Sequence, residues 1–178
     1  MIVVRHSRFV LRHYARKDLP ALLSYYGHPD VLKNVSGRSR PYRRAEAERY
    51  LREKLRQYRR GRAITRPDEI KSMGYAIEVD GSFVGGVGYT LHGHRAVIGY
   101  WLGRPFWGQG LMTDVVRALT AHLSRVHGVR RVEAKVFPFN PASARVLEKA
   151  GFALEGRLRK NHAVQGRLLD HLLFARVR

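Results

Sequence analysis

The sequence contains no cysteine among its 178 residues. This absence excludes disulfide bonds, thiolate metal sites and a cysteine acyl-enzyme. The chain also lacks any run of about 18 apolar residues, so we expect no membrane-spanning helix. Residues 1–6 lack the apolar core and the cleavage site of a signal peptide, which favours a cytoplasmic protein.

Acidic residues are scarce: 14 Asp and Glu stand against 34 Lys and Arg, for a formal net charge of +20. Residues 71–128 hold 5 basic and 3 acidic side chains, whereas both flanks are strongly basic. Apolar residues at helical spacing predict an amphipathic helix over about residues 45–60 with a basic outer face. Such a field steers acidic partners, so ribosomal RNA is a candidate and small polycations are poor ones. An ordinary solvated surface is the alternative.

The most informative segment covers residues 100–112 and reads YWLGRPFWGQGLM. A strand pattern precedes it, and apolar residues at helical spacing follow it until Gly128. Backbone N–H groups at the N-terminus of a helix, together with the helix dipole, bind phosphate. The segment lacks the Lys-Ser/Thr of a P-loop and the spacing of a dinucleotide fingerprint. A tight turn without a ligand is the alternative interpretation.

A second segment, residues 140–152, follows a strand pattern and predicts another helix. Asn140 is a good N-cap, Pro141 suits the first helical position, and Gly151 suits a left-handed helix end. These three residues are also fully explained as ordinary signals for the start and the end of a helix, without a bound ligand.

Together the two segments resemble the coenzyme-A-binding motifs of the GCN5-related N-acetyltransferases (GNAT family), and within it the RimJ/RimL branch that acetylates ribosomal-protein N-termini. The family loop reads Gln/Arg-x-x-Gly-x-Gly/Ala, whereas this chain has Trp107, Gly110 and Met112 at the matching positions. The Trp-Gly-x-Gly form of the branch fits better. The Met112 side chain either crowds the pyrophosphate or points into the core. The resemblance covers about residues 8–176 and implies one domain over residues 1–178.

The fold implied by the resemblance is α+β (mixed α/β), the acyl-CoA N-acyltransferase fold. Its mostly antiparallel sheet is flanked by helices and splays apart between the strand ending near Leu102 and the strand beginning near Arg131. The residue patterns themselves predict the order β-α-α-β-β-β-α-β-α-β-β. The expected strands are 9–12, 73–79, 83–91, 96–102, 132–137, 152–158 and 168–177. Residues 61–70 are expected to form a loop over the substrate side.

The resemblance implies acetyl-CoA as the cosubstrate and no metal. Backbone groups of Trp101, Leu102 and Gly103 would contact the pantetheine and the acetyl carbonyl, and Asn140 would orient the pantetheine. The loop from Trp107 through Met112 would hold the pyrophosphate. The implied cofactor-binding residues are Trp101, Leu102, Gly103, Trp107, Gly108, Gln109, Gly110, Leu111, Met112, Asn140 and Arg145.

The implied mechanism is direct attack of a neutral amine on the thioester. Many relatives place a Tyr two residues before the Lys of the second helix, but this chain has Leu147 there, which leaves Ser143 as the candidate acid. Candidate bases are His162, Glu155 and Glu78, with an ordinary surface role as the alternative for each. At pH 7 an α-amine is about 10% neutral and a lysine about 0.04%, so a protein N-terminus needs less help from a base.

Three functions stay open at this point. The first is an acetyl-CoA-dependent N-acetyltransferase acting on a protein N-terminus, with a ribosomal protein as the candidate partner. The second is a basic RNA- or ribosome-associated binding protein with little catalysis. The third is an acetyltransferase for a small-molecule amine. We expect a monomer or a homodimer.

Overall fold

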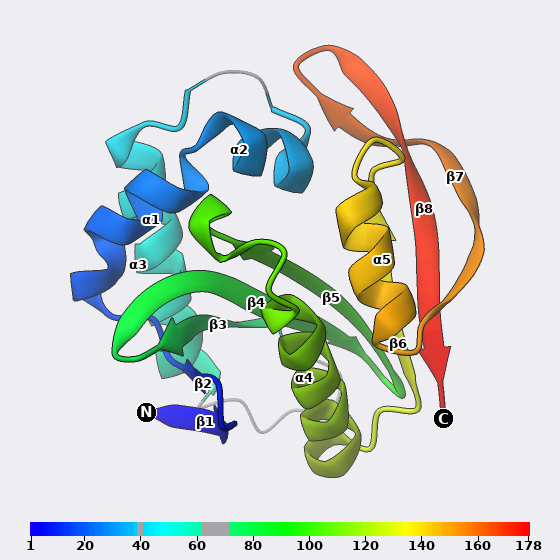
Figure 1. Cartoon of the computed structure of the whole chain (residues 1–178), viewed down its shortest axis with the longest axis horizontal. Coiled ribbons are helices and arrows are strands. Elements are labelled where there is room, and N and C mark those ends of the chain that lie inside the picture. The colour runs from blue at the N-terminus through cyan, green and yellow to red at the C-terminus, as the bar shows by residue number, and fades with distance from the viewer. Residues whose placement is uncertain (39–40, 62–71) are drawn as a thin grey trace.

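A single eight-stranded sheet with helices on both faces forms the molecule (Figure 1). The computed structural model describes residues 1–38, 41–61 and 72–178. The strands are β1 Ile2–Arg5, β2 Val10–Arg12, β3 Ser72–Val79, β4 Ser82–His92, β5 Arg95–Leu102, β6 Arg131–Val136, β7 Ala153–Val164 and β8 Arg167–Val177. The α-helices are α1 Leu19–Tyr26, α2 Pro29–Ser36, α3 Arg44–Gly61, α4 Leu111–His127 and α5 Pro141–Lys149, and η1 Arg16–Asp18 and η2 Arg104–Phe106 are short 3-10 turns. None of the described helices is long and apolar enough to cross a membrane.

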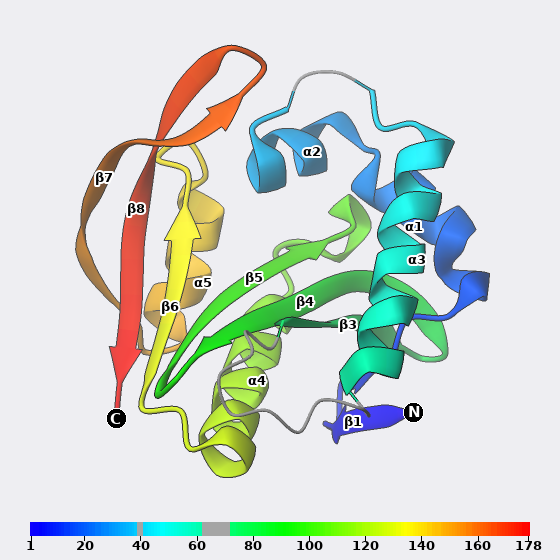
Figure 2. The same ribbon diagram turned by 180° about the vertical axis from the view of Figure 1, so that it is seen from behind.

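The sheet contains one parallel pair and opens beside it. The strand order is β1-β2-β3-β4-β5-β6-β8-β7, and only β5 and β6 run parallel. Their pairing begins at Arg95 opposite Arg131 and stops at Ile98 opposite Ala134. Beyond that point the two strands diverge (Figure 2). The predicted α+β class and the predicted splay between these strands are therefore confirmed.

Each face of the sheet has its own set of buried side chains. In β3, Tyr75 and Ile77 belong to the core under α4, whereas Ala76 packs with α1 and α3 on the opposite face. This is the alternation that a strand buried on both faces requires. As a result, β5 presents different side chains to its two sides, which matters for the site.

Glycine and asparagine fix the ends of the two helices that flank the split. Gly110 (φ 74°) begins α4 and Gly128 (φ 63°) ends it, both in the left-handed region. At α5 the Asn140 side chain accepts the Ser143 N–H, as predicted for an N-cap, and Gly151 (φ 85°) follows the last turn. Both helices therefore begin at the positions expected from local signals.

Three details differ from the expectations. The patterns missed β1 and α2, although α2 carries the signals Pro29 at its first position and Gly37 (φ 67°) after its end. β7 continues to Val164, past the expected strand end at residue 158, and the turn into β8 is only Gln165-Gly166, where both φ angles are positive. The loop expected over residues 61–70 falls almost wholly outside the described residues.

Candidate active site

The split between β5 and β6 leaves two strand edges unpaired. Past the last pair at Ile98, residues 99–102 of β5 and residues 135–136 of β6 pair with no described strand on the facing side. A cavity of about 360 Å³ fills this space, and the ends of α2, α4 and α5 also line it. The lining includes Asn34, Tyr100, Leu102, Phe137, Asn140 and Ser143. A ligand with alternating polar groups can therefore pair here as an extra strand.

The pattern of hydrogen bonds between β5 and β4 determines which backbone groups of β5 face the split. Gly103 N–H donates to Val84 C=O (2.9 Å) across the β4 edge. Successive residues of an antiparallel strand point their backbone N–H and C=O groups to opposite edges of the strand. The backbone groups of Trp101 therefore point toward β4, as those of Gly103 do, whereas those of Tyr100 and Leu102 face the split. The backbone groups of Trp101 and Gly103, which were expected to contact the pantetheine, therefore point toward β4. Those of Tyr100 face the split.

The glycine loop forms the other end of the cavity. Gly108 (φ 77°) and Gly110 (φ 74°) bend the chain into α4. The N–H groups of Thr113 and Asp114 return to the Gly110 carbonyl, whereas those earlier in the first turn have no helical acceptor. The Met112 side chain is buried in the core, and the residue also lines the cavity. The helix start thus presents backbone donors suited to phosphate.

Arg8, which sequence reasoning missed, braces this loop. Its guanidinium donates to Asp114 Oδ2 (2.6 Å) and to the Gln109 carbonyl oxygen (2.8 Å). The Gln109 side chain donates to the Pro105 carbonyl oxygen (3.0 Å) and does not line the cavity. Arg145 on α5 does line it and is exposed, so it adds positive charge to the cavity wall. Arg8 instead pairs with Asp114 and supports the shape of the loop.

Trp107 ties the loop to the end of β5. Its indole Nε1–H donates to the Leu102 carbonyl oxygen (2.8 Å), and the ring remains partly exposed at the cavity wall. Pro105 lies between them in η2. The tryptophan at this position therefore fixes the distance between the strand edge and the glycine loop.

Tyr100 and Ser143 meet inside the cavity. The two hydroxyl oxygens lie 2.9 Å apart, and the Tyr100 hydroxyl also reaches the Ser143 carbonyl oxygen (3.2 Å). Burial raises the pKa of Tyr100 above its usual value near 10, so the phenol stays protonated. Leu147, where relatives carry a tyrosine, is fully buried in the core. A phenol is therefore present after all, supplied by β5 rather than by α5.

Asn140 lies at the cavity but has its polar atoms engaged. Its Oδ1 accepts the Ser143 N–H (3.1 Å), and its Nδ2 donates to the Asn34 carbonyl oxygen in α2 (3.3 Å). The side chain thus caps α5 and joins it to α2. This arrangement positions Ser143 directly.

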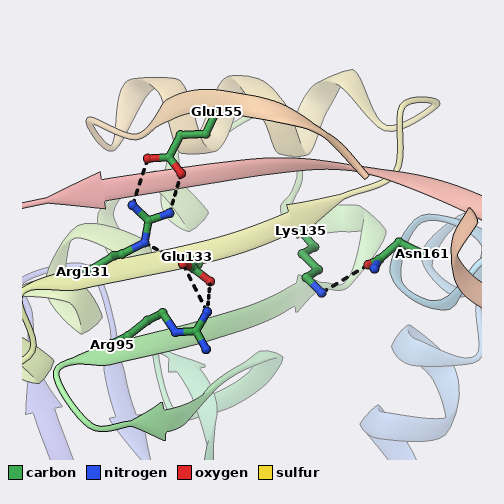
Figure 3. A network of polar contacts seen from close by, with 6 residues as sticks. All are labelled: Arg95, Arg131, Glu133, Lys135, Glu155 and Asn161. Atoms are coloured by element: carbon green, nitrogen blue, oxygen red, sulfur yellow. Dashed lines mark hydrogen bonds and ion pairs between the residues drawn. The ribbon is translucent and has the colours of Figure 1, made fainter. Parts of the chain in front are cut away.

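Glu155 lies away from both cavities, in an ion-pair network that Figure 3 shows. Both of its carboxylate oxygens pair with Arg131, which lowers the pKa of Glu155. Arg131 also binds Glu133 (2.6 Å), which in turn binds Arg95 of β5 (3.2 Å). The network joins β5, β6 and β7 at the closed end of the split. The expectation of Glu155 as a base is therefore corrected: the carboxylate is a structural partner of Arg131.

The other two candidate bases also lie outside the cavity lining. Glu78 binds the buried Arg12 on β2. His162 Nε2 lies 3.3 Å from the Ser36 carbonyl oxygen, and its ring is 5.4 Å from that of His171. His171, which the sequence did not single out, is buried and lines the cavity. Desolvation, with the nearby His162 and Lys135, lowers the pKa of His171, so its imidazole is neutral near pH 7.

A second cavity of about 390 Å³ lies on the α3 side of the sheet. It shares Val35, Ile98, Gly99, Tyr100 and Trp101 with the first cavity, so the two meet at β5. The Trp101 ring is buried on this side, edge to face with Tyr26 at 5.0 Å. Two ligands can thus approach one strand segment from opposite faces. Among the described residues, no three His, Asp or Glu side chains gather as a metal site.

Comparison with known proteins identifies the relatives of this chain. The acetyltransferase (GNAT) domain matches residues 8–153. The uncharacterized N-acetyltransferase p20 of Bacillus licheniformis is 26% identical over 172 residues, which is 95% of this chain and 92% of that protein. The [ribosomal protein uS5]-alanine N-acetyltransferase of Escherichia coli is 30% identical over 112 residues, 61% of this chain and 53% of that protein.

Solved structures share the fold over nearly the whole chain. RimL, a ribosomal L7/L12 alpha-N-protein acetyltransferase in complex with coenzyme A, superposes with a TM-score of 0.82 at 24% identity, covering 99% of this chain and 98% of RimL. The microcin C7 self-immunity acetyltransferase MccE, in complex with acetyl-CoA and AMP, gives a TM-score of 0.82 at 20% identity over 97% and 94% of the two chains. At these identities the likeness concerns the fold.

Proposed function

This chain belongs to the GNAT family and is an acetyl-CoA-dependent N-acetyltransferase, and we propose that its acceptor is the N-terminal α-amine of a protein of the ribosomal type. One observation carries the proposal. Two cavities meet at Gly99, Tyr100 and Trp101 from opposite faces of the sheet. A donor in one and an extended acceptor in the other would be brought together at one strand, which lowers the entropic cost of their reaction.

The first cavity suits acetyl-CoA. The Tyr100 backbone and the Leu102 N–H would pair with the pantetheine, since the Leu102 carbonyl oxygen already accepts the Trp107 indole N–H, and the loop ending at Gly110 would hold the pyrophosphate. Arg145 would add a cation near the phosphates. When bound, the coenzyme supplies an acetyl thioester. Gln109 and Gly103 would shape the loop and the strand rather than contact the coenzyme.

Tyr100 and Ser143 would hold a proton at the wide end of the split, where a sulfur leaving group needs one. Their 2.9 Å contact allows Tyr100 to replace a proton given up by the Ser143 hydroxyl. The neutral imidazole of His171 is the group in the first cavity best able to take a proton from the attacking amine. His162 contacts that ring and would act through it as a positioning residue.

The choice of an α-amine rests on relatives and on chemistry. The E. coli relative modifies the alanine of a ribosomal protein. An α-amine is about 10% neutral at pH 7 and so needs only weak base assistance. The described residues that line the two cavities include no carboxylate, which suits an acceptor that needs no strong base and carries no large positive charge.

A competition between amines tests the proposal. Three acceptors would be incubated with acetyl-CoA: a lysine-free peptide with a free N-terminus, the same peptide N-acetylated with one internal lysine, and spermidine. We expect the first to gain one acetyl group at its α-amine, read by mass spectrometry. Preferential acetylation of the lysine or of spermidine would refute the α-amine assignment while leaving the acetyltransferase activity established.

Contact with ribosomal RNA is a separate proposal, favoured by the outer face of α3. Arg44 and Arg52 are 73% and 69% exposed, and both pair with Glu48. Surface pairs of this kind are weak and leave arginines available to phosphate. Filter binding of an rRNA fragment should weaken steeply between low and physiological salt, and should weaken further in an Arg44→Glu/Arg52→Glu variant. Equal binding by that variant would refute the proposal.

A further inference from the structure

Three glycines stand side by side across three strands on the α3 face of the sheet. Gly74 of β3 is opposite Gly88 of β4, and Gly88 is opposite Gly99 of β5. Residues directly opposite one another point to the same face. All three line the second cavity. The floor of this cavity is therefore a glycine groove, consisting of Gly74, Gly88 and Gly99, that crosses the strands with no side chain on it.

Side chains wall the groove on both sides. One strand level away, Gly86 pairs with Trp101, whose indole ring is buried beside Tyr26. On the other side, Ser72 and Thr90 share a hydroxyl contact of 3.2 Å. The groove thus has the form of a channel that leads from β3 to the β5 edge.

Lys54 lies over the outer end of the groove. A side-chain carbon at Gly74 would come within 2.9 Å of Lys54 Cε, so the glycine makes room for the lysine. Lys54 Nζ sits 5.2 Å from the centre of the Tyr50 ring and 3.3 Å from Gln57 Oε1. Lys54 also lines the cavity. It is held by an aromatic ring and an amide, not by a salt bridge to any residue in the described ranges.

This environment favours an anion. Burial lowers the pKa of Lys54, with a smaller opposing effect from Glu53. A partly desolvated ammonium gains most from a carboxylate that binds beside it. The second cavity therefore ends at a cation, the Lys54 ammonium, that forms no ion pair with a carboxylate among the described residues.

The dimensions of the groove indicate which residue of a bound peptide would reach Lys54. Neighbouring strands lie about 4.8 Å apart, so the path from Gly99 to Gly74 crosses about 10 Å. An extended peptide advances about 3.3 Å per residue, so this path holds about three residues. With its amine at the β5 edge, a peptide would bring its third side chain to Lys54.

We propose that the glycine groove binds the first residues of the acceptor in extended form and that Lys54 selects an acidic side chain at the third residue. The proposal rests on the proposed function, since it assumes a peptide amine at the β5 edge. The strongly basic charge of the whole chain acts in the same direction, because it attracts acidic segments. Lys54 is thereby a specificity-determining residue.

The selection of an acidic third residue can be tested with acceptor peptides that differ only in the position of one glutamate. A neutral, lysine-free peptide with a free N-terminus would carry one Glu at position two, three, four or five, or none, and kcat/KM would be measured for each. We expect Glu at position three to give about a tenfold gain over the neutral peptide, the scale of one charge-assisted contact. Lys54→Met should abolish the gain, and Lys54→Glu should transfer the preference to a peptide with Lys at position three.

Arg56→Glu provides the matched control. Arg56 is exposed on the same helix and is not among the residues lining the groove, so the variant changes the net charge as Lys54→Glu does. It should retain the preference for Glu at position three. Acetylation that ignores the position of Glu, or a preference that Arg56→Glu removes equally, would overturn the inference while the α-amine function stands. If no peptide in the series is acetylated, the proposed function fails and the inference falls with it.

Discussion

Tyr100 on β5 and Ser143 on α5 join hydroxyl groups across the open end of the split, with 2.9 Å between their oxygens. The two residues come from different elements that line the cavity, so the contact links β5 to α5 within it. Ser143 is held in turn by its backbone bond to Asn140. The pair is therefore a fixed proton-bearing unit within the cavity.

Removing the phenol should lower turnover. We expect Tyr100→Phe to reduce kcat by about a hundredfold, because a positioned acid contributes about that much, and to leave acetyl-CoA affinity nearly unchanged. The raised pKa of Tyr100 keeps the phenol protonated, so in the wild type this group should cause no loss of kcat below about pH 10. Steady-state kinetics against pH, with calorimetry for the coenzyme, measure both.

The partner and a matched tyrosine provide the controls. If the pair acts as one unit, Ser143→Ala and the double variant should lose about as much kcat as Tyr100→Phe alone. Tyr89, on the neighbouring strand, is buried and contacts His127 instead, so Tyr89→Phe should leave kcat near the wild-type value. Losses that simply multiply in the double variant would argue against a shared proton.

The glycine loop and both flanking helices could be predicted because their signals are local. Gly110 and Gly128 adopt positive φ angles at the ends of α4, and Asn140 caps α5 through its own side chain. The turn between the expected strands 73–79 and 83–91 rests on an equally local signal, Asp80-Gly81, and both residues have positive φ angles. In each case a few neighbouring residues decide the backbone conformation.

Tyr100, Arg8 and His171 could not be found in this way. Arg8 lies about a hundred residues from the loop that it braces, and no sequence pattern links it to Asp114. Tyr100 lies within the glycine-rich segment 100–112. Only the hydrogen bonds between β5 and β4 show that its backbone, not that of Trp101, faces the split. Local sequence fixes conformations, whereas these residues depend on strand register and long-range packing.

Gly110→Ala should weaken acetyl-CoA binding. Alanine costs about 1 kcal/mol in the left-handed region, and relaxing Gly110 out of it would redirect the N–H groups at the start of α4. We expect at least a tenfold loss of affinity by calorimetry. Space is not the cause, because the nearest atom to the added carbon would be Arg8 Nη1 at 3.9 Å.

Gly81 offers a matched control for this change. It has nearly the same φ angle (76°), a carbon added there would meet nothing within 4 Å, and it lies in the β3–β4 turn outside both cavities. Gly81→Ala should lose a similar amount of stability and bind acetyl-CoA like the wild type. Equal affinity losses in the two variants would mean that general destabilisation, not the loop, controls binding.

Asp18 should be among the most sensitive positions for stability. It is buried and binds the buried Arg12 through both carboxylate oxygens at 2.8 Å, and it also accepts the Ala15 N–H. Breaking a buried pair leaves an uncompensated charge, so Asp18→Asn should lower the free energy of unfolding by about 3 kcal/mol. Glu78, the second partner of Arg12, remains in this variant, so the loss should lie at the lower end of the range for broken buried pairs.

An exposed pair gives the comparison for Asp18. Glu48 pairs with Arg44 at 2.9 Å on the surface of α3. Because water screens such pairs, Glu48→Gln should change the free energy of unfolding by no more than about 0.5 kcal/mol. Urea denaturation of both variants checks the contrast, and similar losses would show that burial does not decide the strength of the Arg12 pair.

Buried histidines should make the protein less stable in mild acid. Burial lowers the pKa values of His171 and His122 in the folded state, so below about pH 6.5 the unfolded chain takes up protons that the folded chain does not. The free energy of unfolding should therefore fall as the pH decreases from 7.5 to 5.5, by at most about 1.4 kcal/mol per pH unit for each histidine. His171→Gln should make this fall shallower, and adding His122→Gln should flatten it further. Urea titrations at several pH values measure the slope. An unchanged slope in the double variant would mean that other groups bind these protons, and that His171 is not the neutral imidazole required of a proton acceptor in the cavity.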